Sequence, residues 1–307
     1  CPRVILMKPD GTTCDGPPDA GRGCLPCHTP DLFAELQDSP IRDEIDQLHV
    51  ASQGDSKPGW DLRSKVRTIL ERPGYLLNQL AKAHTIVAPT EFLRGVFLNN
   101  GAPEERTRHL SYGVDTGTLS EQVASLRQQP RPLTFGFFGT YSPHKGPHVL
   151  VAAMEQVQGE CRALLRGRKT DFADYAQALL ATAAGDTRIT VDGPFARDEL
   201  AQALAEIDIL IVPSTWHENA PFVVLEARAA GLPVLASRFG GLVEVVKDGI
   251  DGDLFDPGDA SDLAKRMQRL IDEPDRLARY RAAVQPPKTL RLAVDEFEDV
   301  YLEAVHR

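Results

Sequence analysis

The sequence lacks an excess of positive charge and any long apolar run. Its 34 Lys and Arg residues are outnumbered by 44 Asp and Glu residues, and the net charge of -10 excludes a general attraction to nucleic acid or anionic lipid. No stretch approaches the roughly 20 apolar residues of a membrane span. The longest buried-looking run, Ile207 to Val212, contains an aspartate and stops at a proline. We therefore expect a soluble, cytoplasmic protein with no nucleic-acid partner.

An initiating methionine is also missing. The first residue is Cys1, and no basic-then-apolar signal segment follows it, so we expect an N-terminally truncated fragment. The composition, 42% hydrophobic and 25% charged, is that of a folding globular chain. At roughly 150 residues per domain, 307 residues leave room for about two domains.

Cysteine is scarce outside the opening segment. Four of the five cysteines lie within the first 27 residues, at Cys1, Cys14, Cys24 and Cys27. The last two form a Cys-x-x-Cys, and four thiolates suit a structural zinc ion. A disulfide pair and four free thiols stay open as alternatives, because the first two spacings match no familiar zinc finger.

From Leu133 onward, short apolar runs alternate with amphipathic segments of helical period. This alternation is typical of strand-helix units wound into a parallel α/β sheet. The predicted strands are 133–139, 161–167, 188–193, 208–214 and 233–237. The predicted helices are 147–157, 171–184, 198–207 and 221–230, followed by helical sequence after 252–256 that ends in an amphipathic stretch, 290–306.

The pattern divides the chain into three parts. Residues 1–130 carry only two convincing strands, 85–89 and 107–112, too few to close a doubly wound sheet, so we expect a partial N-terminal domain. Residues 131–288 form a Rossmann-like domain, with Pro130 and Pro132 at the boundary. Residues 289–307 form a C-terminal helix that could cross back to the first domain.

An anion-binding loop is predicted after the first of these strands. The strand ends at Gly139, a short polar loop leads to Lys145 and Gly146, and a helix then begins at Pro147. A glycine lets a ligand approach the backbone, a helix start presents free N–H groups, and the lysine adds a full charge. The loop matches neither a Walker loop nor a dinucleotide fingerprint, and a tight turn with a solvated lysine is the alternative.

Two carboxylates, Glu218 and Glu226, follow the 208–214 strand. The helical neighbours of Glu226 are all apolar (Phe222, Val223, Ala229 and Ala230), so its charge needs a cation or a ligand hydroxyl pair as partner. Glu218 precedes that helix at the carboxyl end of a strand, where open α/β sheets bind ligands. A structural ion pair or a helix-start acid is the alternative for each.

The motifs together resemble those of the retaining glycosyltransferases of family 4, which have the GT-B fold of two Rossmann-like domains. The resemblance covers nearly the whole chain and rests, in order, on Ala88-Pro-Thr-Glu-Phe-Leu, Tyr112-Gly-Val-Asp115, Phe138-Gly-Thr with His144-Lys-Gly, Pro213-Ser-Thr-Trp, the Glu218/Glu226 pair, Gly231-Leu-Pro-Val, Gly240-Gly, and Asp248-Gly with Gly252. The spaced glutamates with the downstream Gly-x-Pro-Val are the most specific of these.

The resemblance implies a role for each matched residue. Lys145 would contact the donor diphosphate, Glu226 the ribose hydroxyls and Glu218 the donor sugar, with Lys145 and Glu218 as the catalytic pair. The implied donor-binding set is Gly139, Thr140, Lys145, Arg166, Asn219, Ala220, Pro221 and Glu226. One departure is Thr140, where the family usually has Arg; Arg166 or Arg168 are candidates to replace that cation, and His144 is a weaker one.

The resemblance predicts a hexosyltransferase of polysaccharide biosynthesis. It would use a UDP- or GDP-sugar and a saccharide or lipid-linked acceptor, require no metal for catalysis, and associate peripherally with the cytoplasmic membrane face. A nucleotide-sugar epimerase of the same fold and a noncatalytic nucleotide-sugar-binding fragment are the alternatives. Because the acceptor side is expected to be missing, we expect this chain to bind donor but to transfer sugar poorly.

Overall fold

The computed structural model describes residues 8, 12, 14, 16–17, 21–37, 62–115, 117–127 and 130–306. The chain forms two compact units. The first comprises Cys1–Ala88 and Arg94–His109, and the second comprises Pro89–Leu93 and Leu110–Arg307. Among the described residues no helix is both long and apolar enough to cross a membrane.

The described part of the first unit is mainly helical. It contains α1 (Cys24–His28), α2 (Pro30–Gln37), α4 (Leu62–Leu80), β1 (Ile86–Ala88), the 3-10 helix η3 (Glu104–Arg106) and β2 (Thr107–His109). β1 and β2 pair in parallel, and Leu25, Val66 and Leu70 form a small buried cluster between α1 and α4. α5 (Glu91–Asn99) begins among residues of the second unit and continues in the first.

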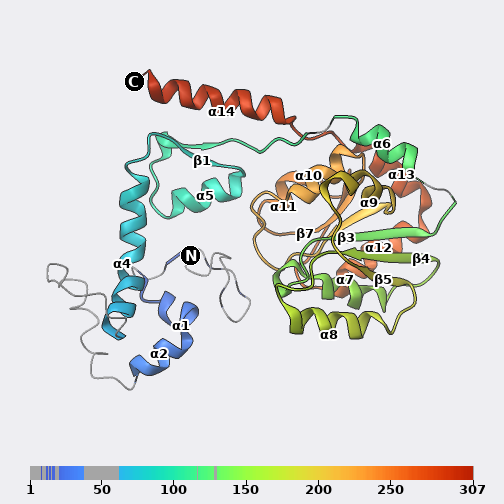
Figure 1. Ribbon diagram of the computed structural model, residues 1–307, viewed down its shortest axis with the longest axis horizontal. Helices are drawn as coiled ribbons and strands as arrows, with labels where there is room; N and C mark the ends of the chain where they lie inside the picture. The colour runs from blue at the N-terminus through green and yellow to red at the C-terminus, as the bar shows by residue number, and fades with distance from the viewer. Residues whose placement is uncertain are drawn as a thin grey trace. The chain divides into compact units, whose positions relative to one another are not determined.

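The second unit is built around a six-stranded parallel sheet (Figure 1). Its strands are β3 (Leu133–Phe138), β4 (Cys161–Arg166), β5 (Ile189–Asp192), β6 (Ile209–Val212), β7 (Val234–Ser237) and β8 (Gly252–Phe255), in the order β5-β4-β3-β6-β7-β8. Its helices are α6 (Leu119–Leu126), η4 (Pro143–Lys145), α7 (Pro147–Met154), α8 (Ala173–Ala183), η5 (Arg197–Glu199), α9 (Leu200–Ala205), α10 (Phe222–Ala229), α11 (Leu242–Val245), α12 (Ala260–Asp272), α13 (Pro274–Ala283) and α14 (Leu290–Val305).

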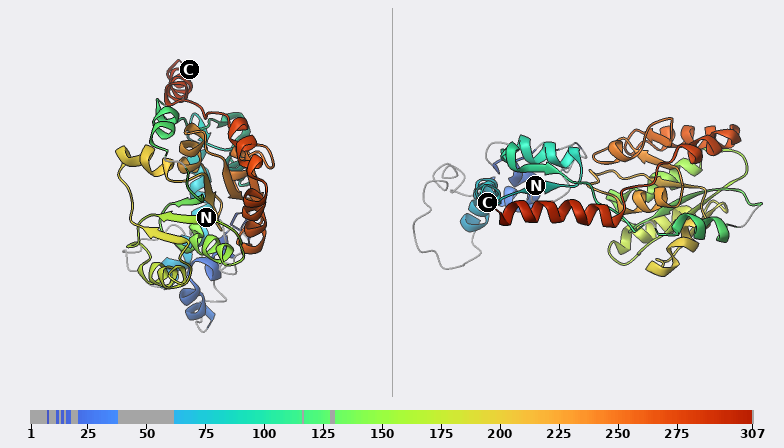
Figure 2. Two further views of the ribbon diagram at one scale, coloured as in Figure 1. Left: turned by 90° about the vertical axis from the view of Figure 1, so that its right-hand side faces the viewer. Right: turned by 90° about the horizontal axis from the view of Figure 1, so that it is seen from above.

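Helices cover both faces of this sheet, so its strands are buried on both sides (Figures 1 and 2). One hydrophobic cluster joins α7, α8 and α12 to one face, and a second joins α6, α9 and α10 to the other. All four residues of β6 are buried, as expected for a strand near the middle of such a sheet. The predicted doubly wound α/β domain is therefore confirmed.

An aspartate just before β6 holds the amino-terminal edge of the sheet together. Asp208 is buried and accepts a hydrogen bond from the backbone N–H of Thr134 at 2.9 Å. Arg127 and Arg281 bind its Oδ1 at 2.9 and 2.7 Å, and Arg131 pairs with its Oδ2 at 3.1 Å. Burial, with Arg281 nearby, lowers the pKa of Arg127 to about 10.

The predicted strands and helices coincide with observed ones, with small differences at their ends. The helix α6 was not predicted, and β8 was predicted only as a segment before helical sequence. Its residues, Gly-Asp-Leu-Phe, begin with two poor strand formers, and it is a strand because it pairs with β7 along its whole length. α10 begins at Phe222, so that Pro221 lies just before the helix and not at its first position as predicted.

Candidate functional site

The order of the strands places two connections side by side at one edge of the sheet. From β3 the chain winds outward through β4 and β5, then returns to the other side of β3 to form β6, β7 and β8. The carboxyl ends of β3 and β6 therefore form the point where the winding changes direction, which is where open α/β sheets bind ligands. Lys145 follows β3, and Glu218 follows β6.

The loop after β3 is fixed by close backbone contacts. Gly146 has a φ of +70°, and a Cβ there would lie 1.9 Å from the carbonyl oxygen of Pro213, so only glycine fits. Thr215 donates its N–H to the carbonyl of His144 at 2.9 Å. Tyr141 is fully buried, with its hydroxyl 2.8 Å from the carbonyl oxygen of Leu165. These contacts join the predicted loop to β4 and to the residues after β6.

Lys145 and Glu218 meet directly, although 73 residues separate them. Lys145 Nζ lies 2.6 Å from Glu218 Oε1, and the same oxygen accepts hydrogen bonds from Ser214 Oγ at 2.7 Å and Trp216 Nε1 at 2.8 Å. The Glu218 side chain is only 7% exposed, whereas the Lys145 side chain is 31% exposed. Three donors on one oxygen satisfy a buried carboxylate and leave part of the lysine accessible.

Aromatic rings surround this pair. The ammonium of Lys145 lies 5.0 Å from the centre of the Trp216 ring, on which it makes a cation–π contact. The His144 ring packs against Trp216 at 4.5 Å and against Phe172 at 5.6 Å. Burial, aided by the charge of Lys145, lowers the pKa of His144, so its imidazole is uncharged at neutral pH and supplies no second cation.

Glu226 lies on α10 and pairs with a residue that the sequence did not single out. Its side chain is 14% exposed, and Arg197, on η5, donates a hydrogen bond from Nη1 to its Oε1. Arg197 therefore supplies the cation that the Glu226 carboxylate, on its apolar helix face, was predicted to need. Phe222, however, which was expected on that same face, is 49% exposed and stacks on Tyr112 with ring centres 5.4 Å apart.

The segment from Glu218 to Pro221 packs against the turn after β7. Gly241 donates its N–H to the carbonyl of Glu218 at 2.8 Å, and a Cβ at Gly241 would lie 2.8 Å from the carbonyl oxygen of Asn219. Asn219 is exposed, Ala220 is half-buried and Pro221 is buried. Asn219 is therefore the side chain of this predicted donor-binding segment that is most open to a ligand.

The structure does not bring Arg166 to Lys145. Its guanidinium lies 3.4 Å from Glu206 and stacks over the ring of Phe195 at 5.3 Å. The backbone carbonyls of Arg166 and Arg168 accept the N–H groups of Gly139 and Tyr141, each at 3.0 Å. The exposed side chain of Arg168 pairs with Asp171 at 3.4 Å. Thr140 is half-buried between Gly139 and Tyr141 and carries no charge.

The predicted zinc ligands fall in the least described part of the chain. Cys1 lies outside the described residues, Cys14 and Cys24 are free thiols, and Cys27 lies on α1. Burial, followed by the neighbouring charges of Cys14 and Cys27, raises the pKa of Cys24. Among the described residues no group of three or more His, Cys, Asp or Glu is arranged to hold a metal ion.

Comparison with known proteins decides the family. Residues 120–285 match the family described as glycosyl transferases group 1. The chain belongs to this family. Members similar to it include the D-inositol 3-phosphate glycosyltransferase of Mycobacterium sp. (strain JLS), 31% identical over 63% of this chain and 45% of that protein. The enzyme of the same name from Stackebrandtia nassauensis is 28% identical over 78% of this chain and 55% of that protein.

Solved structures of glycosyltransferases with the GT-B fold match the structure of this chain. Anabaena Alr3699/HepE in complex with UDP-glucose matches with a TM-score of 0.68 at 22% identity, over 79% of this chain and 76% of that one. Sucrose-phosphate synthase from Thermosynechococcus elongatus matches with a TM-score of 0.66 at 23% identity, over 85% and 65%. The predicted family and fold class are confirmed, although the chain spans about half the length of the curated relatives it matches.

Proposed function

We propose that this protein transfers a hexosyl group from a nucleoside-diphosphate sugar to a saccharide or lipid-linked acceptor, with retention of the anomeric configuration. The observation that carries the proposal is the convergence of Lys145 and Glu218 where the winding of the sheet reverses. A lysine beside a ligand crevice suits a phosphate, and HepE, a structural neighbour of this chain, was solved with UDP-glucose.

Lys145 would stabilise the leaving group. Transfer breaks the bond between the anomeric carbon and the diphosphate oxygen, and the electron pair goes to the diphosphate. A bond to the acceptor oxygen forms as that oxygen gives its proton to the departing diphosphate. The ammonium of Lys145 uses one donor on Glu218 and has two more for the oxygens on which charge develops. We propose that this cation serves in place of a divalent metal ion.

Glu218 and Glu226 would hold the two ends of the donor. Glu218 keeps Lys145 oriented and lies at the sugar end, while Glu226, with its charge balanced by Arg197, accepts hydrogen bonds from the ribose hydroxyls. A UDP- or GDP-sugar as donor, cytoplasmic location, peripheral membrane association and a structural zinc at the opening cysteines are further parts of the proposal.

Calorimetry on a lysine variant tests the proposal. We expect Lys145→Ala to weaken binding of UDP, or of GDP if that is the donor nucleotide, by roughly ten- to a hundredfold, because it removes a charge-assisted hydrogen bond worth about 1.5–3 kcal/mol. Binding of the free nucleoside should change less than about twofold.

The matched control is Lys265→Ala, which removes an exposed lysine on α12. Its affinities should equal those of the parent protein. Equal losses for diphosphate and nucleoside in Lys145→Ala would refute the role of Lys145, and the absence of nucleotide binding in the parent protein would refute the proposed function.

A further inference from the structure

Arg197 contacts Glu226 from a rigid part of the backbone. η5, which carries it, connects β5 to α9, and Glu199 accepts the N–H of Ala196 at 2.7 Å while it donates its own N–H to the Ala196 carbonyl at 3.1 Å. Leu200 anchors the following turn in the core. The backbone is thus held on both sides of Arg197, and the long side chain is the part that can adjust.

The two partners differ in exposure. The Arg197 side chain is 67% exposed, whereas that of Glu226 is 14% exposed. Arg197 also borders an open cavity of about 370 Å³, which is lined in addition by Asp115, Gly117 and Gln122. An ion pair with one partner so exposed contributes little to stability, so a purely structural role explains this contact poorly. The guanidinium is placed where a ligand that reaches Glu226 would meet it.

The contact uses one of the two carboxylate oxygens. Arg197 Nη1 donates to Oε1 of Glu226, and Oε2 has no hydrogen-bond partner in the described part of the chain. A carboxylate oxygen only accepts hydrogen bonds, and a guanidinium only donates them. A hydroxyl between the two can do both: it donates its proton to Glu226 and accepts a hydrogen bond from Arg197. This is the hydrogen-bonding pattern that a ribose diol requires.

We propose that Arg197 is a positioning residue that sets the preference of the site for ribose. It holds Oε1, keeps the Glu226 carboxylate turned with Oε2 toward the ligand, and offers its remaining N–H groups to the hydroxyl that Oε2 binds. A site built to hydrogen-bond a hydroxyl rejects the analogue that lacks it, because its polar groups are then left unpaired. The inference rests on the proposed function, since it assigns the partner of Glu226 within the same donor site.

Binding of UDP and 2′-deoxy-UDP, measured by calorimetry, tests the inference. We expect the parent protein to favour UDP by about tenfold or more. Arg197→Ala should reduce this ratio to less than about threefold, and Arg197→Lys should restore part of it. In a Glu226→Gln background, Arg197→Ala should have no further effect on the ratio, because the two residues act through one contact.

The control variant is Arg279→Ala, which removes an arginine of similar exposure, 63%, paired only at 3.8 Å with Glu273. The ratio of its affinities for UDP and 2′-deoxy-UDP should equal that of the parent protein. If the parent protein favours UDP and Arg197→Ala keeps the full preference, Arg197 is structural and the inference is overturned. If the parent protein binds neither UDP nor GDP, the proposed function fails as well. If it binds the ribonucleotide and its 2′-deoxy analogue equally, the ribose role of Glu226 fails and the inference with it.

Discussion

At the scale of single residues, Glu226 gives a sharp prediction about ligand choice. An amide accepts hydrogen bonds less strongly than a carboxylate and no longer balances the charge of Arg197. We expect Glu226→Gln to lose most of the preference for UDP over 2′-deoxy-UDP and to leave binding of inorganic pyrophosphate within about twofold of the parent protein. Calorimetry with the three ligands measures this, and an unchanged ribose preference would make Glu226 a structural residue.

The sequence predicted the need of Glu226 for a partner but did not identify the partner. Apolar neighbours on a helix indicate burial, and a buried carboxylate needs a counter-charge. Nothing in the spacing links it to Arg197, which lies 29 residues earlier on a 3-10 helix. Ser214 and Trp216 were visible only as part of a motif, because their donation to Glu218 depends on how the segment after β6 folds back.

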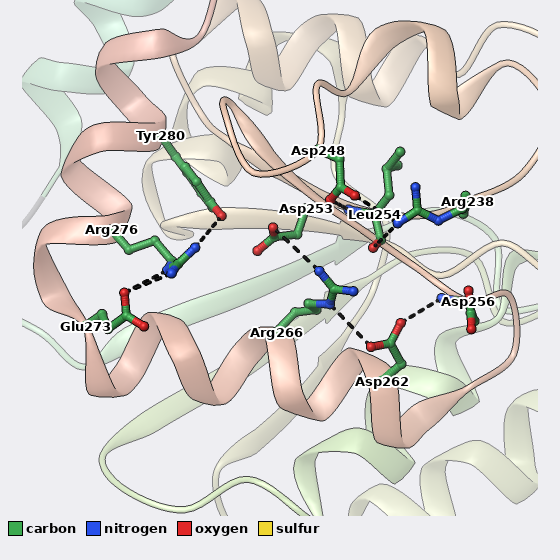
Figure 3. A network of polar contacts seen from close by, with 10 residues as sticks. All are labelled: Arg238, Asp248, Asp253, Leu254, Asp256, Asp262, Arg266, Glu273, Arg276 and Tyr280. Carbon is green, nitrogen blue, oxygen red and sulfur yellow. Dashed lines mark hydrogen bonds and ion pairs between the residues drawn. The ribbon is translucent and has the colours of Figure 1, made fainter.

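At the scale of elements, β8 joins the sheet through a strand that begins with a glycine and an aspartate. Asp253 is buried in a network with Arg266, Arg276 and Tyr280 from the helices that follow (Figure 3). Arg266 approaches its Oδ1 to 3.9 Å, and Arg276 donates to the Tyr280 hydroxyl at 3.1 Å. Periodicity could not reveal this strand because its first two residues are poor strand formers, and its polar residue is tolerated only through contacts from the helices that follow.

This network predicts opposite pH dependences for two aspartates. Burial raises the pKa of Asp253 above its ordinary value of 3.8, so its ionised form destabilises the folded state. That cost is absent below pH 3.8 and becomes complete as the pH rises through the folded-state pKa. Asp253→Asn should therefore be more stable than the parent protein at pH 7, with an advantage that shrinks toward pH 4, as measured by urea unfolding.

Asp248 provides the matched control in the same network. Burial alone would raise its pKa, but the N–H of Leu254 and the guanidinium of Arg238 outweigh this effect and lower it. The ionised form of Asp248 therefore stabilises the fold, and this stabilisation is lost as the pH falls from 3.8 through the lowered pKa. Asp248→Asn should be less stable than the parent protein at pH 7. If both variants changed the free energy of unfolding in the same direction, the opposite roles of the two aspartates would be contradicted.

At the scale of the whole molecule, the residues proposed to hold the donor all belong to the second unit. A ligand that binds only there should slow amide hydrogen exchange mainly there. We expect UDP to slow exchange in residues 139–146 and 214–226 and to leave α4 (Leu62–Leu80) unchanged, as measured by mass spectrometry. Equal slowing in α4 would show that the donor also engages the first unit.

The two units were predictable to different degrees. Alternating apolar runs and helical segments define the sheet of the second unit because its strands are buried on both faces and its connections are short. The described part of the first unit has a two-stranded sheet and a 19-residue helix, α4, with Pro73 in its interior. The hydrophobic core of this unit is small, so few apolar positions in its sequence show a regular period. The division into residues 1–130, 131–288 and 289–307 stays a prediction.

The buried carboxylate of Asp208 bears on whether the sheet region could be circularly permuted or inserted into another protein. Arg127 and Arg131 bind it from the segment that enters the sheet, and Arg281 binds it from α13, near where the chain leaves. The two ends of the sheet region are therefore fastened at one point, as in domains that tolerate circular permutation or insertion into a host loop. Because α6 also packs on the sheet, a segment moved to another protein would need to run from α6 to α13.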